Sequence, residues 1–303
     1  MHRPSGRPGF LADPPGFLRV WAHLAGNADM LVGMSTLRAA VVQLQCQDDV
    51  PQNLAECRRQ VLRARGLGAQ LALLPENFAY MGAEVDKCQH AETLGGGPIQ
   101  DALAALAREA ELTLIAGGFP EKSADDRRPF NTALVFGPDG SLRAQYRKIH
   151  LFDVALADGT VLSESSATSA GTDAVITEVA GACVGLSICY DLRFPELYRK
   201  LVDQGAQVLV VPAAFTLQTG KDHWHPLLRA RAIESQCWLL AAGQWGRHPK
   251  GRLTYGHSLI VDPWGVVVAE CSDGVGVAVA DLDFELLARV RAAVPCLEHR
   301  RLK

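Results

Sequence analysis

From Leu37 onward, short apolar runs alternate with segments in which apolar residues recur at helical spacing. Runs of about five apolar residues predict buried strands. Between residues 52 and 65, by contrast, Leu54, Cys57 and Val61 fall on one helical face. The predicted strands are 39–44, 70–74, 112–117, 131–136, 184–188, 207–211, 238–242, 257–261, 266–270 and 275–280, and the predicted helices are 52–65, 99–111, 195–205, 222–236 and 283–292. This alternation favours an α/β fold with layered helices.

Other segments lack this pattern. Residues 1–33 carry prolines at positions 4, 8, 14 and 15 and show little periodicity. They also lack the compact apolar core and cleavage site of a secretory signal. We expect residues 1–33 to be a disordered, dispensable extension of a domain formed by residues 34–303. Two alternative interpretations of residues 1–33 are a short organelle-targeting peptide and an upstream extension of the reading frame. Segments 77–97, 120–130 and 152–173 are predicted loops.

Composition narrows the class of protein. The 303 residues are 48% hydrophobic, enough for one large α/β domain or two small ones. The formal charge is −3 and no run of Lys or Arg occurs, so nucleic acid is not an expected partner. The longest apolar runs, such as residues 208–211, are too short to span a membrane, and no membrane partner is expected.

Cysteine and histidine usage adds two expectations. Eight cysteines are scattered without CxxC spacing in a chain too long to need disulfides. This usage is typical of free thiols in the reducing cytosol, so we expect a cytoplasmic protein without a structural zinc site. His223 and His225 flank Trp224, but two imidazoles do not make a metal site.

The stretch around Cys189 carries candidate chemistry. The apolar run 184–188 leads into this cysteine, and Pro195 fits the first turn of the next helix. A cysteine between a strand end and a helix start is expected to be exposed at the sheet edge. Nearby backbone N–H groups and the positive helix end would then favour its thiolate. From this stretch alone, a catalytic nucleophile and a buried free cysteine remain equally open.

Two further motifs occur earlier in the chain, and together the three resemble the nitrilase (carbon–nitrogen hydrolase) superfamily, which uses Glu, Lys and Cys in this chain order. LLPEN contains Glu76, YRKIHLF contains Lys148 and SICYDLRFPEL contains Cys189. HWHPLLRARAIE and YGHSLIVDPWG extend the resemblance from about Leu37 to the chain's end. It implies a four-layer α-β-β-α sandwich, with helices outside two packed sheets. It also implies a homodimer or larger homo-oligomer.

The resemblance assigns roles in amide hydrolysis. Cys189 would attack the carbonyl and form a thioester, and Glu76 would act as general base. Lys148 would stabilise the oxyanion, with help from the backbone N–H of Tyr190. A free glutamate is too weak a base for a thiol, so we expect burial or crowding to raise the pKa of Glu76. The reaction requires neither a metal nor an organic cofactor.

A second glutamate is expected after the lysine. Glu164, within Leu162-Ser163-Glu164-Ser165, resembles it and would hold Lys148 and orient substrate or water. The preceding Ala157-Asp158-Gly159 departs from the proline and glycine usual in the family.

Arg193 has two interpretations. Its guanidinium could anchor a substrate carboxylate, or it could form a structural ion pair with Asp191 or Glu196.

Several other residues have uncertain relations to the pocket. Phe152, Tyr80 and Phe215 could line it or belong to the core. His225 stands where many relatives carry glutamate, and it would alter substrate choice if it touched the pocket. We assign His257 and Ser258 structural roles.

The segments Gly246-Arg247-His248, YGHS and DPWG resemble the branch of the family that hydrolyses deaminated glutathione, a metabolite-repair amidase releasing 2-oxoglutarate and cysteinylglycine. The small-molecule alternatives are an ω-amidase acting on 2-oxoglutaramate, or another amide, nitrile or carbamoyl hydrolase. A scaffold that leaves the site unused is also open, because fold does not fix function. Intact Glu76, Lys148 and Cys189 count against it. A serine hydrolase would need a GxSxG elbow, which the sequence lacks.

Overall fold

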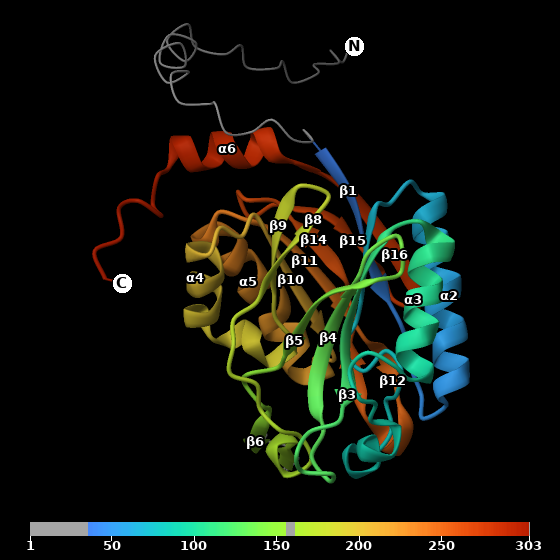
Figure 1. The fold of residues 1–303 in the computed structure, drawn as a ribbon. Helices are drawn as coiled ribbons and strands as arrows, with labels where there is room; N and C mark the ends of the chain where they lie inside the picture. The colour runs from blue at the N-terminus through green and yellow to red at the C-terminus, as the bar shows by residue number, and fades with distance from the viewer. Residues whose placement is uncertain (1–35, 156–160, 303) are drawn as a thin grey trace, which may run out of the picture. The chain divides into compact units, whose positions relative to one another are not determined.

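The computed structural model describes residues 36–155 and 161–302, which form two six-stranded sheets (Figure 1). The first sheet has the order β16 (Gly276–Asp283), β1 (Thr36–Gln43), β2 (Leu71–Leu74), β3 (Thr113–Glu121), β4 (Phe130–Phe136) and β5 (Leu142–Arg147). The second has the order β15 (Val267–Glu270), β14 (Leu259–Val261), β11 (Trp238–Gly243), β10 (Val208–Ala213), β9 (Ala182–Leu186) and β8 (Ile176–Val179). Two further sheets have two antiparallel strands each. One pairs β6 (Asp153–Ala155) with β7 (Val161–Ser163), and the other pairs β12 (Trp245–Arg247) with β13 (Leu253–Tyr255).

Each sheet has a parallel centre, which explains why the central strands are apolar throughout. β2 pairs in parallel with β1 and β3, and β10 pairs in parallel with β9 and β11. Every residue of β2 and of β10 is buried. Parallel strands are covered on both faces, so their sequences are continuous apolar runs instead of alternating ones.

The two faces of the first sheet belong to different cores. Val41 and Leu73 pack in one cluster with Leu186 and Val210 of the second sheet. The opposite face packs in a second cluster against α2 (Val50–Gly66) and α3 (Pro98–Ala110). Because successive strand residues point to opposite faces, this division shows sheet packed against sheet with helices outside.

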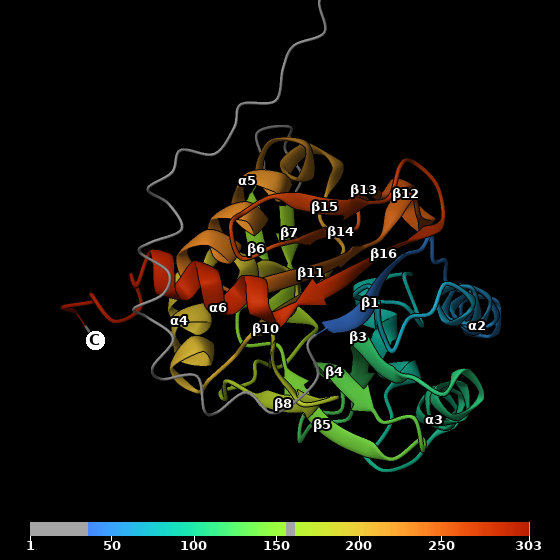
Figure 2. The same ribbon diagram turned by 90° about the horizontal axis from the view of Figure 1, so that it is seen from above.

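The second sheet is covered by α4 (Pro195–Asp203) and α5 (Leu217–Ser235), so the layers run helix, sheet, sheet, helix (Figures 1 and 2). The four-layer α-β-β-α prediction is confirmed. A last helix, α6 (Phe284–Ala293), follows β16. Asp283 caps its N-terminus, because its side chain accepts from Glu285 N and Leu286 N.

Several predicted boundaries are wrong for local reasons. α5 begins at Leu217, well before residue 222, because the Thr216 side chain caps it by accepting from Thr219 N. The strand predicted over 257–261 begins only at Leu259, because His257 has a left-handed φ of 54°. Helix α4 ends at Asp203, close to its predicted end at about residue 205.

The predicted loops contain short ordered elements. Segment 77–97 includes the 3-10 helix η3 (Glu84–His90), and segment 152–173 includes β6, β7 and the 3-10 helix η4 (Glu164–Ser166). β5, β8, β12 and β13 were not predicted.

The predictions for residues 1–33, and the Ala157-Asp158-Gly159 departure, lie outside the described residues. Among the described residues, no helix is both long and apolar enough to cross a membrane.

Candidate active site

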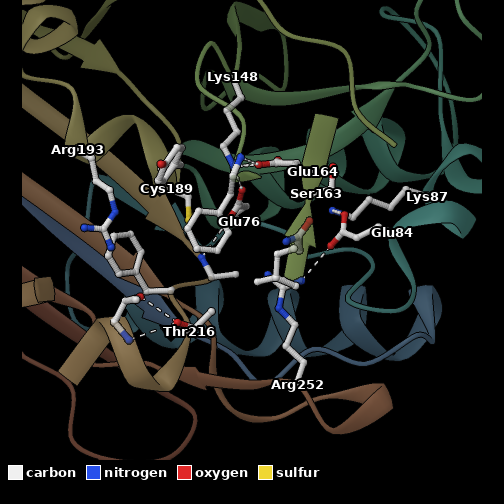
Figure 3. A pocket seen from close by; sticks show the side chains of 17 residues that line it. Glu76, Glu84, Lys87, Lys148, Ser163, Glu164, Cys189, Arg193, Thr216 and Arg252 are labelled. Atoms are coloured by element: carbon white, nitrogen blue, oxygen red, sulfur yellow. Dashed lines mark hydrogen bonds and ion pairs between the residues drawn. The ribbon is translucent and has the colours of Figure 1, made fainter. Parts of the chain in front are cut away.

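One pocket gathers the side chains that the three motifs predicted (Figure 3). The empty space between its lining residues is about 570 Å³, and this figure includes space open to solvent. Glu76 follows β2, Lys148 follows β5, Cys189 follows β9, and Ala214 follows β10. The packing of the two sheets brings these strand ends together, so residues far apart in sequence share one pocket.

Lys148 is the centre of a buried charge network. Its Nζ donates to Glu76 Oε1 at 2.9 Å and to the two Glu164 oxygens at 2.9 and 2.8 Å. Burial alone would lower the pKa of this lysine, but the carboxylates of Glu164 and Glu76 outweigh it and hold the pKa well above its usual value. The pocket floor therefore contains a permanent cation between two carboxylates.

Glu76 is 3% exposed, and both its oxygens are hydrogen-bonded. Oε1 accepts from Lys148 and from Asn131 Nδ2, each at 2.9 Å, and Oε2 accepts from Ala214 N at 3.0 Å. Burial acts to raise the pKa of Glu76, but the charges of Lys148 and Lys87 outweigh it and leave the pKa below its ordinary value. The prediction of a raised pKa was wrong because these two cations are supplied by distant segments.

Cys189 is the first residue of the 3-10 helix η5 (Cys189–Arg193), which follows β9, and it has a left-handed φ of 50°. It is only 8% exposed, and α4 begins at Pro195, so the prediction of an exposed cysteine at that helix start was wrong. Burial and the Glu76 carboxylate raise the pKa of the thiol well above its usual value, against the opposing charge of Lys148. The resting site therefore pairs a neutral thiol with an ionised glutamate.

Glu164 lies where the sequence placed it. Besides Lys148, its Oε2 accepts from Phe152 N at 2.7 Å, which ties η4 to the segment that follows Lys148.

Two positioning residues were missed by the sequence analysis. The first is Asn131, at the start of β4. Its Nδ2 donates to Glu76 at 2.9 Å and to Glu164 at 3.3 Å, and its carbonyl accepts from Lys148 N at 2.8 Å. Gly118 lies behind this group with a φ of 77°, and a Cβ there would come within 2.5 Å of Asn131 Oδ1. The only sequence signal for Asn131 was its polar side chain at the start of a strand that is mostly apolar.

The second is Asp191, which is fully buried. Its carboxylate accepts from Tyr146 Oη at 2.6 Å, from Ile188 N at 2.9 Å and from His150 N at 3.0 Å. Because Tyr146 and His150 flank Lys148, this carboxylate joins the lysine segment to the cysteine turn. The polar break after Cys189 was its signal.

Arg193 and Tyr190 both line the pocket. The Arg193 guanidinium carbon lies 5.4 Å from the centre of the Phe215 ring, and Nη1 lies 3.3 Å from His223 Nδ1. Among the described residues no carboxylate pairs with Arg193, so the predicted ion pair with Asp191 or Glu196 is absent. A guanidinium without a carboxylate partner thus faces the pocket.

Of the three aromatic candidates, Phe152 and Phe215 line the pocket. Tyr80 does not, and instead packs against His90 at 4.4 Å. His225 also lies outside the pocket lining and contacts Glu270 at 2.9 Å.

The pocket also contains a partly buried group of ion pairs that the sequence did not predict. Glu84 Oε2 lies 2.7 Å from Lys87 Nζ, and Glu84 Oε1 lies 3.0 Å from Arg252 Nη1. Burial works against the carboxylate, but Lys87 and Arg252 lower the pKa of Glu84 to about 2. These side chains come from η3 and from beside β13, segments without a motif.

Comparison with known proteins decides the family. Residues 38–292 match the family model of carbon-nitrogen hydrolases. The chain belongs to the carbon–nitrogen hydrolase family. It is a hydrolase acting on carbon–nitrogen bonds other than peptide bonds, with small-molecule amides as its class of substrate.

The family's curated members include close relatives of this chain. It is 43% identical over 270 residues to a deaminated glutathione amidase of Synechocystis, covering 88% of this chain and 99% of that relative. It is 41% identical over 267 residues to the deaminated glutathione amidase of Homo sapiens, covering 86% of this chain and 81% of that protein.

Solved structures of the family share the fold. The C. elegans NitFhit protein superposes with a TM-score of 0.82 at 38% identity, covering 89% of this chain and 66% of that one. Saccharomyces cerevisiae Nit3, a member of branch 10 of the nitrilase superfamily, superposes with a TM-score of 0.81 at 30% identity. The match covers 89% of this chain and 98% of that one. An amidase of Nesterenkonia superposes with a TM-score of 0.72 at 27% identity, covering 86% of this chain and 98% of that one. A glutamate-to-glutamine mutant of that amidase was solved with acrylamide added to the active-site cysteine.

Proposed function

We propose that this chain hydrolyses deaminated glutathione to 2-oxoglutarate and cysteinylglycine through a thioester on Cys189. The observation that carries the proposal is the convergence of Cys189, Glu76 and Lys148 in one pocket. Relatives at 41–43% identity that are named deaminated glutathione amidases support the choice of substrate.

In the acylation half, Cys189 Sγ attacks the amide carbonyl while its proton moves to Glu76. The resting thiol is neutral, so this proton transfer accompanies the attack. Lys148 Nζ and the Tyr190 backbone N–H stabilise the oxyanion as it develops. Glu76 then gives the proton to the leaving amine of cysteinylglycine, and the C–N bond breaks.

In the deacylation half, Glu76 takes a proton from water, and the resulting hydroxide attacks the thioester carbonyl. The C–S bond breaks, 2-oxoglutarate leaves, and the proton returns to the Cys189 sulfur. Glu164 holds Lys148 in place through both halves, since it contacts that ammonium with both oxygens.

Arg193 is proposed to bind the carboxylate of the α-keto acid end. Guanidinium binds carboxylate through two parallel hydrogen bonds, and Arg193 has no protein carboxylate in that place among the described residues. The substrate 2-oxoglutaramate has the same acid end, so this contact alone does not separate the two amidase activities.

The test is turnover of deaminated glutathione and of 2-oxoglutaramate, offered separately to the purified chain. We expect faster turnover of deaminated glutathione, abolished in Cys189→Ala. A preference for 2-oxoglutaramate, again lost in Cys189→Ala, would keep the proposed nucleophile and refute the proposed substrate. Equal inertness of wild type and variant on both would refute the substrate assignment as a whole.

We further propose that residues 34–303 form the catalytic domain, and that the protein is cytoplasmic and assembles as a homodimer or larger homo-oligomer. The eight free cysteines support the compartment. Exposed Trp264 (58%), Val266 (50%) and Ile233 (48%) support an assembly surface. Sedimentation of the purified chain tests the assembly, and a monomer at micromolar concentration would refute it.

A further inference from the structure

A cluster of three side chains outside the pocket lining has no role in the proposed reaction. His225 comes from α5, His257 from the turn between β13 and β14, and Glu270 from the end of β15. His225 Nε2 and His257 Nδ1 each lie 2.9 Å from Glu270 Oε1. One ligand atom from each residue lies within 4.8 Å of the other two.

The composition of this cluster matches a metal site. Two imidazoles and one carboxylate are a known ligand set for zinc and for other divalent transition metals. Bonds of about 2.0–2.1 Å place tetrahedral ligand atoms roughly 3.3 Å apart. The two 2.9 Å contacts therefore need to open by only a few tenths of an ångström to admit an ion.

The surroundings leave access for an ion and hold the ligands in place. The side chains of His225, His257 and Glu270 are 31%, 27% and 34% exposed, so an ion can enter and water can occupy a fourth position. The ring of His257 stacks on the ring of Tyr255, with 4.4 Å between the ring centres. The backbone carbonyl of His257 accepts from Trp224 Nε1 at 2.8 Å.

The second nitrogen of His257 also has a charged neighbour. Its Nε2 lies 3.6 Å from Asp273 Oδ1. A carboxylate beside the outer nitrogen of a ligating histidine fixes the ring and makes it a better donor.

We propose that His225, His257 and Glu270 bind one divalent transition-metal ion of the zinc class. The ion joins α5 to the β14–β15 edge of the second sheet. The sequence alone offered His223 and His225, which do not make a site. In the fold, His257 and Glu270 lie beside His225, whereas His223 is not part of the cluster. Because none of the three ligands lines the pocket, hydrolysis does not depend on this ion.

The test is calorimetric titration of Zn²⁺ into the full chain carrying Cys189→Ala, which removes the pocket thiol as a competing ligand. We expect one ion per chain, with affinity at least about tenfold weaker in His225→Ala and in Glu270→Gln. His223→Ala is the matched control, because this exposed histidine lies on the same helix but outside the cluster. It should bind Zn²⁺ as its parent does, and circular dichroism should show all variants folded.

Cobalt provides an independent readout. Co²⁺ in the site should give visible bands of a tetrahedral nitrogen and oxygen environment, lost in Glu270→Gln. Equal Zn²⁺ binding by all variants would place the ion outside the cluster, and a sulfur-to-cobalt charge-transfer band would place it on a cysteine. Either result would overturn the proposal. If the Cys189→Ala chain binds no Zn²⁺, Glu270 acts only as a hydrogen-bond acceptor for the two histidines, and the proposal is overturned.

Discussion

Replacing Glu76 by glutamine separates the two effects that this side chain has on Cys189. The carboxylate is proposed to accept the thiol proton during attack, and its charge also raises the pKa of that thiol at rest. Glu76→Gln removes the base, so kcat should fall by the 10²–10⁴ typical of general-base catalysis, or about 3–5 kcal/mol. It also removes a raising influence while the lowering influence of Lys148 remains, so the pKa of Cys189 should fall.

The contacts of Glu76 also determine how far the Glu76→Gln substitution lowers the free energy of unfolding. In the Glu76→Gln variant, the amide oxygen can take the place of Oε1, where Lys148 and Asn131 both donate. The amide NH₂ group then faces Ala214 N, which donates to Oε2 at 3.0 Å in the wild type. Two donors face each other there, and one buried hydrogen bond is lost. We expect a loss of about 1–3 kcal/mol in the free energy of unfolding.

The assay pairs turnover with alkylation by iodoacetamide, followed across pH by the mass of the peptide containing Cys189. Glu76→Gln should be nearly inactive in turnover, yet its Cys189 should alkylate at lower pH than in the wild type. The matched control is Glu92→Gln, a buried glutamate that contacts the start of α3 outside the pocket and should leave the alkylation profile unchanged. An unchanged or upward-shifted profile in Glu76→Gln would refute this account of the thiol.

The contacts of Glu76, Arg193 and Asp191 support three further predictions. Because Lys148 and Lys87 hold the pKa of Glu76 below its ordinary value, its ionised form should persist below about pH 4.3. Above that pH, both kcat/KM and the stability that this carboxylate contributes should therefore be fully present. Both should be lost only as the pH falls through the lowered pKa of Glu76. An activity limb near about pH 6 would contradict this. Arg193→Lys should raise KM for keto-acid substrates at least about tenfold with little change in kcat, measured by steady-state kinetics, since lysine cannot form the bidentate pair. Unchanged KM would remove Arg193 from the binding site. Asp191→Asn should lower the free energy of unfolding by about 1–3 kcal/mol in urea titrations, because the carboxylate that accepts from Tyr146 and Ile188 is replaced by an amide whose NH₂ faces a donor. A stability within about 0.5 kcal/mol of wild type would show that this carboxylate does not hold the turn.

The residues of the candidate site could be predicted because each lies in a short local motif, and the three motifs together resemble those of the family. Glu76, Lys148 and Cys189 each follow a strand closely, and the ends of strands in two packed sheets meet at one edge. The alternation of buried runs with helices that are apolar on one side predicted only an α/β fold with layered helices. The four-layer order came from the resemblance to the family.

The electrostatics could not be predicted because they depend on which distant side chains meet. The pKa of Glu76 is lowered by Lys148, 72 residues away, and by Lys87 from a predicted loop. The partners of Arg193 and the contacts of Asn131 are equally non-local. The short strands β8, β12 and β13 have three or four residues each, too few for a period to show.

The central claim is that the substrate is acylated onto Cys189, and the most direct measurement is the mass of the enzyme during turnover. The purified chain is mixed with deaminated glutathione, quenched in acid within one turnover and digested. We predict a 2-oxoglutaryl group on the peptide containing Cys189, absent without substrate and absent in Cys189→Ala. Turnover that continues in Cys189→Ala, or an acyl group on another cysteine, would contradict the account.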